Sequence, residues 1–501
     1  MSANVFDVFY PQLAVGKRHQ PLLTLADGQQ WSRQQVLEAS GRLANFFVAQ
    51  GLVPGDRVTV QIDKGPLGLC LYLACLRAGL VYHPLNTGYQ PAELAYFLEN
   101  AEPSAVICSS AYEAPLTALC DRLGIERRWT LNGDDTGTLV DASGAMAVQF
   151  ETVARGPDDL AALLYSSGTT GRPKGIMLSH ANMAASARAL HEAWAFSESD
   201  RLLHMLPVFH VHGLFVAIHC VLMSGAQMVY LPKFDAQQAL RWLPECTVMM
   251  GVPTFYTRLL DARIGREHCP NVRVFISGSA PLLAETFRDF EAATGHRILE
   301  RYGMTETNMN TSNPLHGERR AGTVGQALPG VGLQVVDDAG QPLPPGEVGS
   351  IQVKGANVFQ GYWRMPEKTA EDIGADGFFN TGDKGALSAD GYLSIIGRAK
   401  DLIITGGLNV YPKEVELLID EQPGVLESAV IGVPHPDFGE AVVAVVVGDA
   451  QWPDVQAAVA QGLAKFKQPK QYIAVKELPR NTMGKVQKAA LRAQYQGLFQ
   501  S

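Results

Sequence analysis

Short strand-like runs alternate with helix-length segments over most of this chain, and this alternation constrains the fold more than any other feature. Strand-like runs include 57–62, 105–108, 227–231 and 272–277, and 91–100 is an example of a helix-length segment between them. Alternation of this kind is typical of folds in which helices connect mostly parallel strands. We therefore expect an α/β fold with largely parallel sheets.

Two later regions have a different pattern of strand-like and helix-like segments. From Gly322 short strands are separated by Gly- and Pro-rich breaks such as 343–346, which predicts a β-rich part at about 322–399. After residue 400 an amphipathic segment at 412–421, further strand-like runs and a C-terminal helix predict a small α+β unit. We expect a large N-terminal domain at 1–399 and a C-terminal domain at 400–501, joined by a tight hinge.

Composition supports this division and excludes several classes. A chain of 501 residues exceeds the usual size of one hydrophobic core, and 47% hydrophobic with 18% charged residues describes an ordinary globular protein. The formal charge of −9 argues against a nucleic-acid-binding surface, and an anionic substrate then needs Lys and Arg concentrated locally. No apolar run is long enough for a membrane span, so no membrane partner is expected.

Cysteine usage and the first residues indicate the compartment. The 7 cysteines include no C-x-x-C pair and lie mostly in apolar stretches, as buried thiols do, rather than in a disulfide or zinc pattern. The segment from Met1 to Asp7 has no basic or Arg-rich pattern of a targeting peptide. We expect a cytoplasmic protein.

A hydroxyl- and Gly-rich loop lies between two apolar runs. The strand-like run 160–165 leads into Ser-Ser-Gly-Thr-Thr-Gly-Arg-Pro-Lys-Gly at 166–175, and a second strand-like run follows at 176–179. Three glycines allow close backbone approach, and hydroxyls, backbone N–H groups and Lys174 can surround phosphate oxygens. The spacing is not that of a Walker A loop, because no Gly-Lys-Ser/Thr follows a four-residue gap. The pattern predicts a phosphate-binding loop of another kind.

This loop resembles the signature of the adenylate-forming superfamily, which includes acyl-CoA synthetases, peptide-synthetase adenylation domains and luciferases. Four further segments resemble the other motifs of that superfamily in the expected order: 302–306 (Tyr-Gly-Met-Thr-Glu), 380–383 (Asn-Thr-Gly-Asp), 397–401 (Gly-Arg-Ala-Lys-Asp) and 479–485 (Pro-Arg-Asn-Thr-Met-Gly-Lys). Each motif is short, but five in order are specific, and they extend over nearly the whole chain.

The resemblance implies ATP, Mg²⁺ and coenzyme A as substrates and cofactors, and it assigns roles residue by residue. Glu306 and Thr170 would hold Mg²⁺, Asp383 would accept hydrogen bonds from the ribose, and Arg398 would contact the nucleotide. The residues that the resemblance assigns to ATP binding are Ser166, Ser167, Gly168, Thr169, Thr170, Gly171, Lys174, Gly278, Ser279, Ala280, Glu300, Tyr302, Gly303, Met304, Thr305, Asp383 and Arg398.

The end of the chain carries the expected catalytic group. Lys485 would bridge the carboxylate and the α-phosphate, where negative charge develops in the transition state of adenylation. In the resembled family the C-terminal domain then rotates about a hinge, here Lys400, and Gly406 and Gly407 come in to line the tunnel for coenzyme A. The resemblance also suggests an acetylating and deacetylating enzyme pair acting on Lys485, which would remove its charge.

The acid is indicated by Glu300-Arg301 ahead of Tyr302, where many family members carry a small or neutral residue. A cation at the border of the acyl pocket needs a partner, and a carboxylate on the substrate can bind Arg301 bidentately. His210, in the segment 206–215, could donate a second hydrogen bond, and Met309 would limit the length of the acid.

The chain also resembles malonyl-CoA synthetases over essentially its full length, including the runs 250–258 and 306–314. This resemblance implies ligation of malonate to coenzyme A, with methylmalonate open as a second substrate because Val211 stands where Thr is frequent. The alternatives are a coenzyme A ligase for another short acid, a domain that loads a carrier protein, a luciferase-type enzyme and a nucleotide-binding protein without catalysis.

Overall fold

The computed structural model describes residues 2–14, 16–89, 91–166, 173–405, 408–463, 465–481 and 484–499. Its helices and helical turns are α1 (Phe6–Ala14), α2 (Arg33–Ala49), α3 (Pro66–Arg77), α4 (Pro91–Ala101), η1 (Ser110–Tyr112), α5 (Glu113–Leu123), α6 (Thr138–Ser143), α7 (His180–Trp194), η2 (His212–Ala217), α8 (Ile218–Ser224), α9 (Ala236–Trp242), η3 (Leu243–Glu245), α10 (Pro253–Asp261), η4 (Arg266–His268), α11 (Ala284–Thr294), α12 (Pro366–Asp372), η5 (Ala399–Asp401), α13 (Pro412–Asp420), α14 (Trp452–Gly462), η6 (Lys465–Lys467) and α15 (Lys488–Tyr495). No described helix has the length and apolar character that a membrane crossing requires.

Two large sheets with mostly parallel pairing form the body of the fold. The nine-stranded sheet contains, in spatial order, β15 (Gln326–Ala327), β14 (Asn308–Ser312), β13 (Leu299–Met304), β12 (Val274–Ser277), β11 (Val248–Gly251), β9 (Arg201–His204), β10 (Gln227–Tyr230), β1 (Pro21–Thr24) and β2 (Gln30–Ser32). The seven-stranded sheet contains β18 (Gly361–Tyr362), β8 (Lys174–Ser179), β7 (Leu160–Ser166), β4 (Val81–Pro84), β3 (Arg57–Gln61), β5 (Ala105–Cys108) and β6 (Arg128–Thr130). The predicted α/β class is confirmed.

The strands around the phosphate loop follow the sequence pattern closely. β7 and β8 pair antiparallel, with Ser166 opposite Lys174, so the loop connects two adjacent strands. β8 then runs directly into α7, because Ser179 accepts the N–H of Asn182 at 3.2 Å while the Asn182 side chain accepts the N–H of Ser179 at 2.9 Å. This reciprocal cap stabilises the start of the helix. A second strand, rather than a helix, follows the loop as predicted.

A four-stranded antiparallel sheet lies in the region after Gly322, where the sequence has short strands separated by Gly- and Pro-rich breaks. It consists of β16 (Val331–Val336), β17 (Gly349–Gly355), β19 (Phe379–Leu387) and β20 (Leu393–Arg398). The register of β19 and β20 places Asp383 opposite Arg398. This sheet therefore brings two of the predicted nucleotide-binding residues together.

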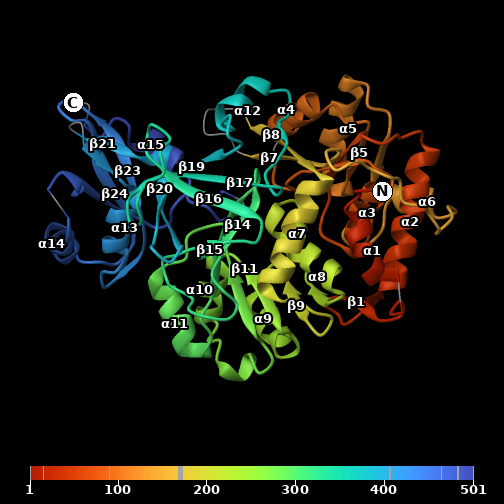
Figure 1. Ribbon diagram of the computed structural model, residues 1–501, viewed down its shortest axis with the longest axis horizontal. Helices are drawn as coiled ribbons and strands as arrows, with labels where there is room; N and C mark the ends of the chain where they lie inside the picture. The colour runs from red at the N-terminus through yellow and green to blue at the C-terminus, as the bar shows by residue number, and fades with distance from the viewer. Residues whose placement is uncertain are drawn as a thin grey trace.

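The residues after 400 form a further sheet with its own packing. Its strands are β22 (Leu408–Val410), β21 (Ile403–Thr405), β24 (Gly439–Gly448) and β23 (Val425–His435), with β25 (Gln471–Val475) on β24. The apolar run 441–447 alternates between two cores: Val442 and Val446 pack with α13, and Val443 and Val445 pack with Leu491 of α15. Because both faces are covered, the run is continuously apolar. Figure 1 shows this part (blue) at the opposite end of the molecule from α2 and α3.

Candidate active site

A buried carboxylate lies at the centre of the predicted nucleotide site. Asp383, 4% exposed, accepts a hydrogen bond of 2.5 Å from the hydroxyl of Tyr302 and lies 3.0 Å from Nε of Arg398. Burial and then Asp383 raise the pKa of Tyr302, so its hydroxyl remains a donor. Three predicted residues from β13, β19 and β20 therefore meet, and the carboxylate is held in a fixed orientation.

Glu306 has the properties expected of a magnesium ligand. It is buried, burial raises its pKa, and the Ser166 hydroxyl is 3.4 Å from its Oε1. Within the described ranges no group of three or more His, Cys, Asp or Glu side chains could hold a metal. A single carboxylate fits Mg²⁺ that is bound mainly through phosphates and water, which is the usual arrangement for this ion. The other predicted ligand, Thr170, lies outside the described residues, as do Ser167, Gly168, Thr169 and Gly171.

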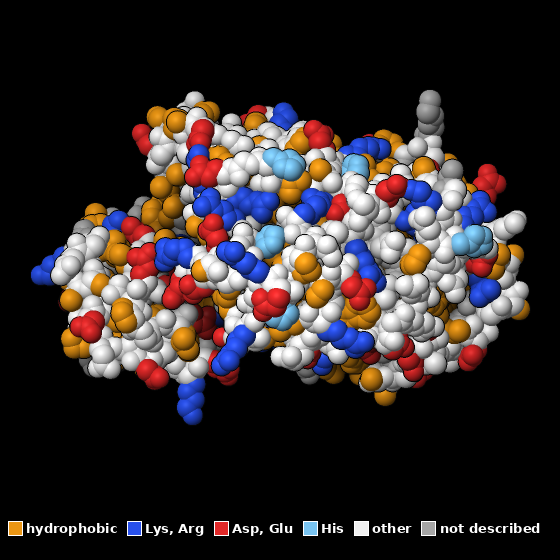
Figure 2. Space-filling model, turned by 90° about the horizontal axis from the view of Figure 1, so that it is seen from below, with side chains coloured by type: hydrophobic (Ala, Val, Ile, Leu, Met, Phe, Trp, Pro, Cys, Tyr) orange, Lys and Arg blue, Asp and Glu red, His pale blue; other side chains and the backbone are white. Residues whose placement is uncertain are grey.

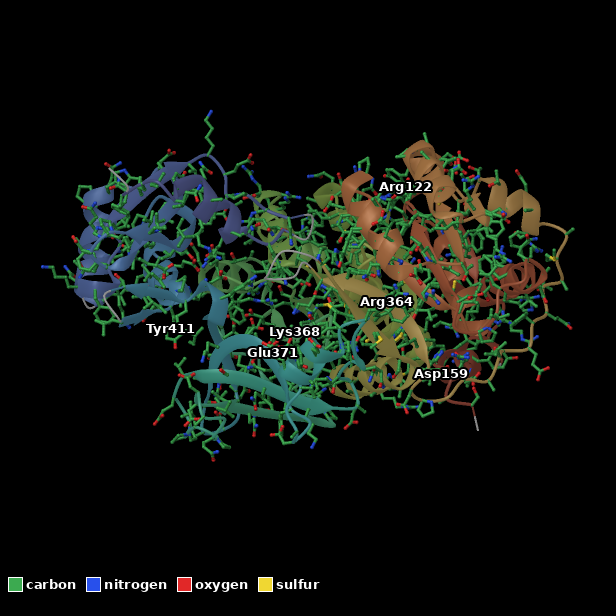
Figure 3. All side chains as sticks on the ribbon, turned by 90° about the horizontal axis from the view of Figure 1, so that it is seen from above. Arg122, Asp159, Arg364, Lys368, Glu371 and Tyr411 are labelled. Atoms are coloured by element: carbon green, nitrogen blue, oxygen red, sulfur yellow. The ribbon has the colours of Figure 1, made fainter. Side chains whose placement is uncertain are left out.

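Lys174 is engaged by α12. Its Nζ lies 3.8 Å from Asp372 and 4.5 Å from the ring centroid of Tyr362. Asp372 also binds Lys368 at 2.8 Å, and Lys368 binds Glu371 at 2.9 Å; Figure 3 shows Lys368 and Glu371 close together. Asp372 thus binds both Lys174 and Lys368, and phosphate oxygens would compete with Asp372 for the ammonium group of Lys174.

The segment 278–280 packs against the predicted acid site. A Cβ at Gly278 would lie 2.4 Å from Cζ of Arg301, so only glycine leaves room for that guanidinium group. Ser279 has φ +74°, a conformation that non-glycine residues rarely adopt, and its Oγ lies 3.2 Å from Nδ1 of His212. Ala280 is half-buried beside it. This strained turn therefore links the segment predicted to bind adenine with the acid site.

Arg301 is the most informative side chain of the site. It lies on β13, is 3% exposed, and its Nε and Nη2 have no hydrogen-bond partner among the described residues. Burial lowers its pKa to about 10, which leaves it charged at neutral pH. A buried guanidinium with free donors is costly unless an anion completes it.

Two histidines lie near the charges of the site, His210 near Lys485 and His212 near Arg301. Nε2 of His210 and Nε2 of His212 also have no hydrogen-bond partner in the described part of the chain. Burial and then Lys485 lower the pKa of His210 to about 3, and burial followed by Arg301 lowers the pKa of His212 well below its usual value. Both rings are therefore neutral, and each can offer one N–H to an acid without repelling Arg301.

The remaining predicted residues near β13 differ in what they contact. A Cβ at Gly303 would lie 2.4 Å from Cε of Met309, so Gly303 makes room for this buried methionine. Met304 and Thr305 are half-buried. Glu300 accepts the N–H of Leu282 at 3.2 Å, and burial raises its pKa to about 8. The side chain of Glu300 thus supports the turn before α11, on the opposite face of β13 from Arg301.

Lys485 enters this group of charges from the C-terminal part. Its N–H donates to Asn481 Oδ1 at 2.9 Å, and the adjacent Gly484, at φ +73°, lies against Thr254. The residue is exposed as a whole, but its ammonium end is enclosed; burial and then Arg398 lower its pKa to about 8.

Other charges reach the same ammonium group. Asp383 and Glu306 favour its charged form, and Arg301 disfavours it. The structure thus brings together residues of five predicted motifs. Lys400 is exposed next to Asp401, which binds Arg492 at 2.7 Å, whereas Gly406 and Gly407 lie outside the described residues. Figure 2 shows Lys and Arg side chains gathered in a band, with histidines among them, across the face seen from below.

Comparison with protein families decides the identity of the fold. The model of the AMP-binding enzyme family matches residues 13–363, and that of the AMP-binding enzyme C-terminal domain matches residues 414–485. The chain belongs to the AMP-binding enzyme family. The resemblance inferred from the five motifs is confirmed.

Individual members of this AMP-binding family cover nearly the whole chain. A malonate–CoA ligase of Arabidopsis thaliana is 32% identical over 93% of this chain and 85% of its own length. The mitochondrial malonate–CoA ligase ACSF3 of Mus musculus is 35% identical, with 89% and 83% covered. A sulfoacetate–CoA ligase of Cupriavidus necator is 35% identical, with 97% and 98% covered.

Solved structures of the family show the same arrangement. ATP-bound MatB from Rhodopseudomonas palustris is 51% identical, with 100% of both chains covered and a TM-score of 0.97. The apo form of the same protein, with the same identity and coverage, gives a TM-score of 0.86. The chain therefore has the arrangement of the ATP-bound relative, in agreement with Lys485 lying among the charges of the site.

Sequence reasoning missed some residues of this AMP-binding enzyme's site. His212 bonds Ser279, whereas only His210 had been assigned to the acid. The pair of histidines two residues apart was the available signal. Lys64, which contacts the strand before these histidines, is 140 residues away in sequence from His204 and gave no local signal.

Proposed function

We propose that this chain ligates malonate to coenzyme A at the expense of ATP, through malonyl-adenylate. The observation that carries the proposal is Arg301, a buried cation. Its Nε and Nη2 have no hydrogen-bond partner among the described residues, and an acid with a second negative group would supply one. The names of the malonate–CoA ligases that resemble the chain support the same substrate.

In the first step a carboxylate oxygen of malonate bonds to the α-phosphorus of ATP, and the bond to pyrophosphate breaks. Both reactants are anions, so the barrier depends on positive charge near the reacting atoms. Arg301 would hold the distal carboxylate, and Lys485 would lie between the reacting carboxylate and the α-phosphate. Tyr302, Asp383 and Arg398 would fix the nucleoside. Together these residues bring the two anions into line.

Mg²⁺ fits this chemistry, with Glu306 and Thr170 as its protein ligands. When bound, it would neutralise charge on the phosphates and on the departing pyrophosphate. Lys174 would leave Asp372 for the same phosphates, because Asp372 retains Lys368 as a partner.

In the second step the thiol of coenzyme A attacks the carbonyl carbon, and the bond to AMP breaks. Lys485 fills the site during adenylation, so we propose that the C-terminal domain at 400–501 rotates about Lys400 before the thiol enters. Gly406 and Gly407 would then line its path. Acetylation of Lys485 would block only the first step. We also propose a cytoplasmic location and an enzyme pair that acetylates and deacetylates Lys485.

Sulfoacetate is a second candidate acid, because a sulfoacetate–CoA ligase is 35% identical over 97% of the chain. A sulfonate accepts hydrogen bonds from a guanidinium as a carboxylate does, so Arg301 alone does not separate the two acids. Methylmalonate stays open because Val211, which is 6% exposed, presents an apolar side chain in the segment of His210.

The test is AMP and pyrophosphate formation with malonate, methylmalonate, sulfoacetate, succinate, acetate and propionate, with and without coenzyme A. We expect the highest kcat/KM with malonate and thioester formation only with coenzyme A. A preference for acetate or propionate would refute the malonate assignment. Absence of nucleotide consumption with every acid would refute the ligase.

A further inference from the structure

A lysine far from the motifs joins the two large sheets beneath the acid site. Lys64 lies between β3 and α3, on the seven-stranded sheet. Its Nζ is 2.7 Å from Nδ1 of His204, the last residue of β9 in the nine-stranded sheet, and 3.0 Å from the carbonyl oxygen of the same residue. It is also 3.1 Å from the carbonyl oxygen of Leu206, just after β9. It also lies 4.3 Å from the ring centroid of Tyr230. Three acceptors and an aromatic ring thus surround Nζ of Lys64, and burial lowers the pKa of this lysine well below its usual value.

The chemistry of the acceptors fixes the direction of these bonds. His204 is 0% exposed, and its Nε2 lies 2.9 Å from the carbonyl oxygen of Gly213. A carbonyl only accepts, so Nε2 carries the proton and Nδ1 accepts from Lys64. Burial and then Lys64 lower the pKa of His204 well below its usual value, which keeps the ring neutral. Lys64 therefore orients the ring that binds Gly213.

These hydrogen bonds hold together the two ends of the segment 205–212, which we call the histidine loop. Lys64 binds the loop where it begins, at the carbonyl of Leu206, and His204 binds the carbonyl of Gly213 just after it ends. A Cβ at Gly213 would lie 2.0 Å from the carbonyl oxygen of Pro207, so the two ends of the loop touch. The loop is thus fastened at both ends by one lysine–histidine pair.

The histidine loop carries side chains of the acid site. His212 bonds Ser279, which lies beside Gly278 and hence beside Arg301. After burial, the charge of Arg301 is the next cause that lowers the pKa of His212, as expected of two groups that lie near each other. A shift at the base of the loop would therefore move the donors that face the acid.

We propose that Lys64, acting through His204, is a positioning residue that fixes the histidine loop against Arg301 and so sets the affinity for the acid. The inference rests on the proposed function, because that function defines the acid site. It concerns the acid more than the nucleotide: the histidine loop meets the predicted nucleotide site at Ser279, whereas Tyr302, Asp383 and Arg398 lie on other elements.

The test compares Lys64→Met, which keeps the length of the stem, with Lys233→Met, an exposed lysine after β10. For Lys64→Met we expect KM for malonate to rise about tenfold or more while KM for ATP stays within about twofold. Lys233→Met should leave both constants unchanged. An unchanged KM for malonate, or equal increases for malonate and ATP, would overturn the proposal.

A second variant tests the route through His204. His204→Asn can still accept from Lys64 but cannot reach Gly213, so it should raise KM for malonate similarly. The double variant should lose less than the product of the two single effects, because both changes break one chain of bonds. Independent, multiplicative effects would contradict the route through His204. If Lys64→Met does not fold, His204→Asn gives the same comparison of malonate with ATP.

A crystal structure separates this inference from the substrate assignment. If the wild-type chain uses none of the six acids named above, the proposed function fails. The measurement is then the position of the histidine loop in crystals of the variants. A displaced histidine loop in the crystals of Lys64→Met or His204→Asn would support the positioning role. An unmoved loop would overturn it, whatever the substrate.

Discussion

Replacing Arg301 by Met tests the substrate assignment most directly. In the structure Nε and Nη2 of Arg301 have no hydrogen-bond partner among the described residues, and a carboxylate would receive both. Hydrogen bonds to charged groups are worth about 1.5–3 kcal/mol each, so two contribute about 3–6 kcal/mol. We therefore expect kcat/KM for malonate to fall by about 10²- to 10⁴-fold.

The assay is pyrophosphate release with malonate and with propionate, which lacks the second charge. Propionate should be affected much less, and Arg288→Met, an exposed arginine on α11, should change neither acid. Removing a buried cation whose Nε and Nη2 have no hydrogen-bond partner in the described part of the chain should leave the melting temperature equal or raise it. Retained malonate turnover, or an equal loss for both acids with a lower melting temperature, would refute the role of Arg301.

Three further changes have distinct expected outcomes. Lys485→Ala should abolish adenylate formation, yet supplied malonyl-adenylate should still give the thioester; in the wild type, adenylation should decline above the pKa of about 8. Equal loss in both half-reactions would contradict this. Gly278→Ala places a Cβ 2.4 Å from Cζ of Arg301, so KM for malonate but not for propionate should rise about tenfold or more, as measured by steady-state kinetics. Equal rises for both acids would contradict a displaced guanidinium. Burial raises the pKa of Glu300 to about 8, so between its ordinary pKa and pH 8 Glu300 is protonated in the folded chain and ionised in the unfolded chain. The free energy of unfolding of the wild type therefore falls as pH rises through that range. Glu300→Gln should remove this dependence and, at pH 9, stabilise the chain by on the order of a few kcal/mol in urea unfolding; equal pH slopes would contradict it.

Sequence periodicity predicted best the strands whose residues are all buried and the helices whose first residue is marked by the sequence. The run 105–108 is β5 as predicted, because all of its residues are buried, and 412–421 became α13 to within a residue because Pro412 starts the helix. The strand predicted at 272–277 begins at Val274, since the N–H of Val272 bonds back to the carbonyl of Cys269 just after η4. Boundaries therefore depended on turns that periodicity does not describe.

Within the site, sequence reasoning found groups that motifs mark and missed those that only topology joins. Arg301 could be predicted because it differs from the neutral residue usual beside Tyr302. The contact of Lys64 with His204 exists because two sheets pack together, and neither residue lies in a motif. The collision of a Cβ at Gly278 with Arg301 likewise depends on the packing of β12 and β13, which no local pattern encodes.

Arg301 and Lys485, the two cations of the proposed mechanism, differ in how they are attached, and this difference suits the separate roles proposed for them. Arg301 is buried on β13, an interior strand of the nine-stranded sheet, and cannot move away without disturbing the packing of that sheet. The backbone N–H of Lys485 bonds Asn481 in the C-terminal part, and the neighbouring Gly484 lies against Thr254 of the N-terminal part. A fixed cation can select the acid in both half-reactions. A cation on a separate unit can stabilise one transition state and then withdraw, so that the thiol meets an adenylate no longer shielded by the lysine.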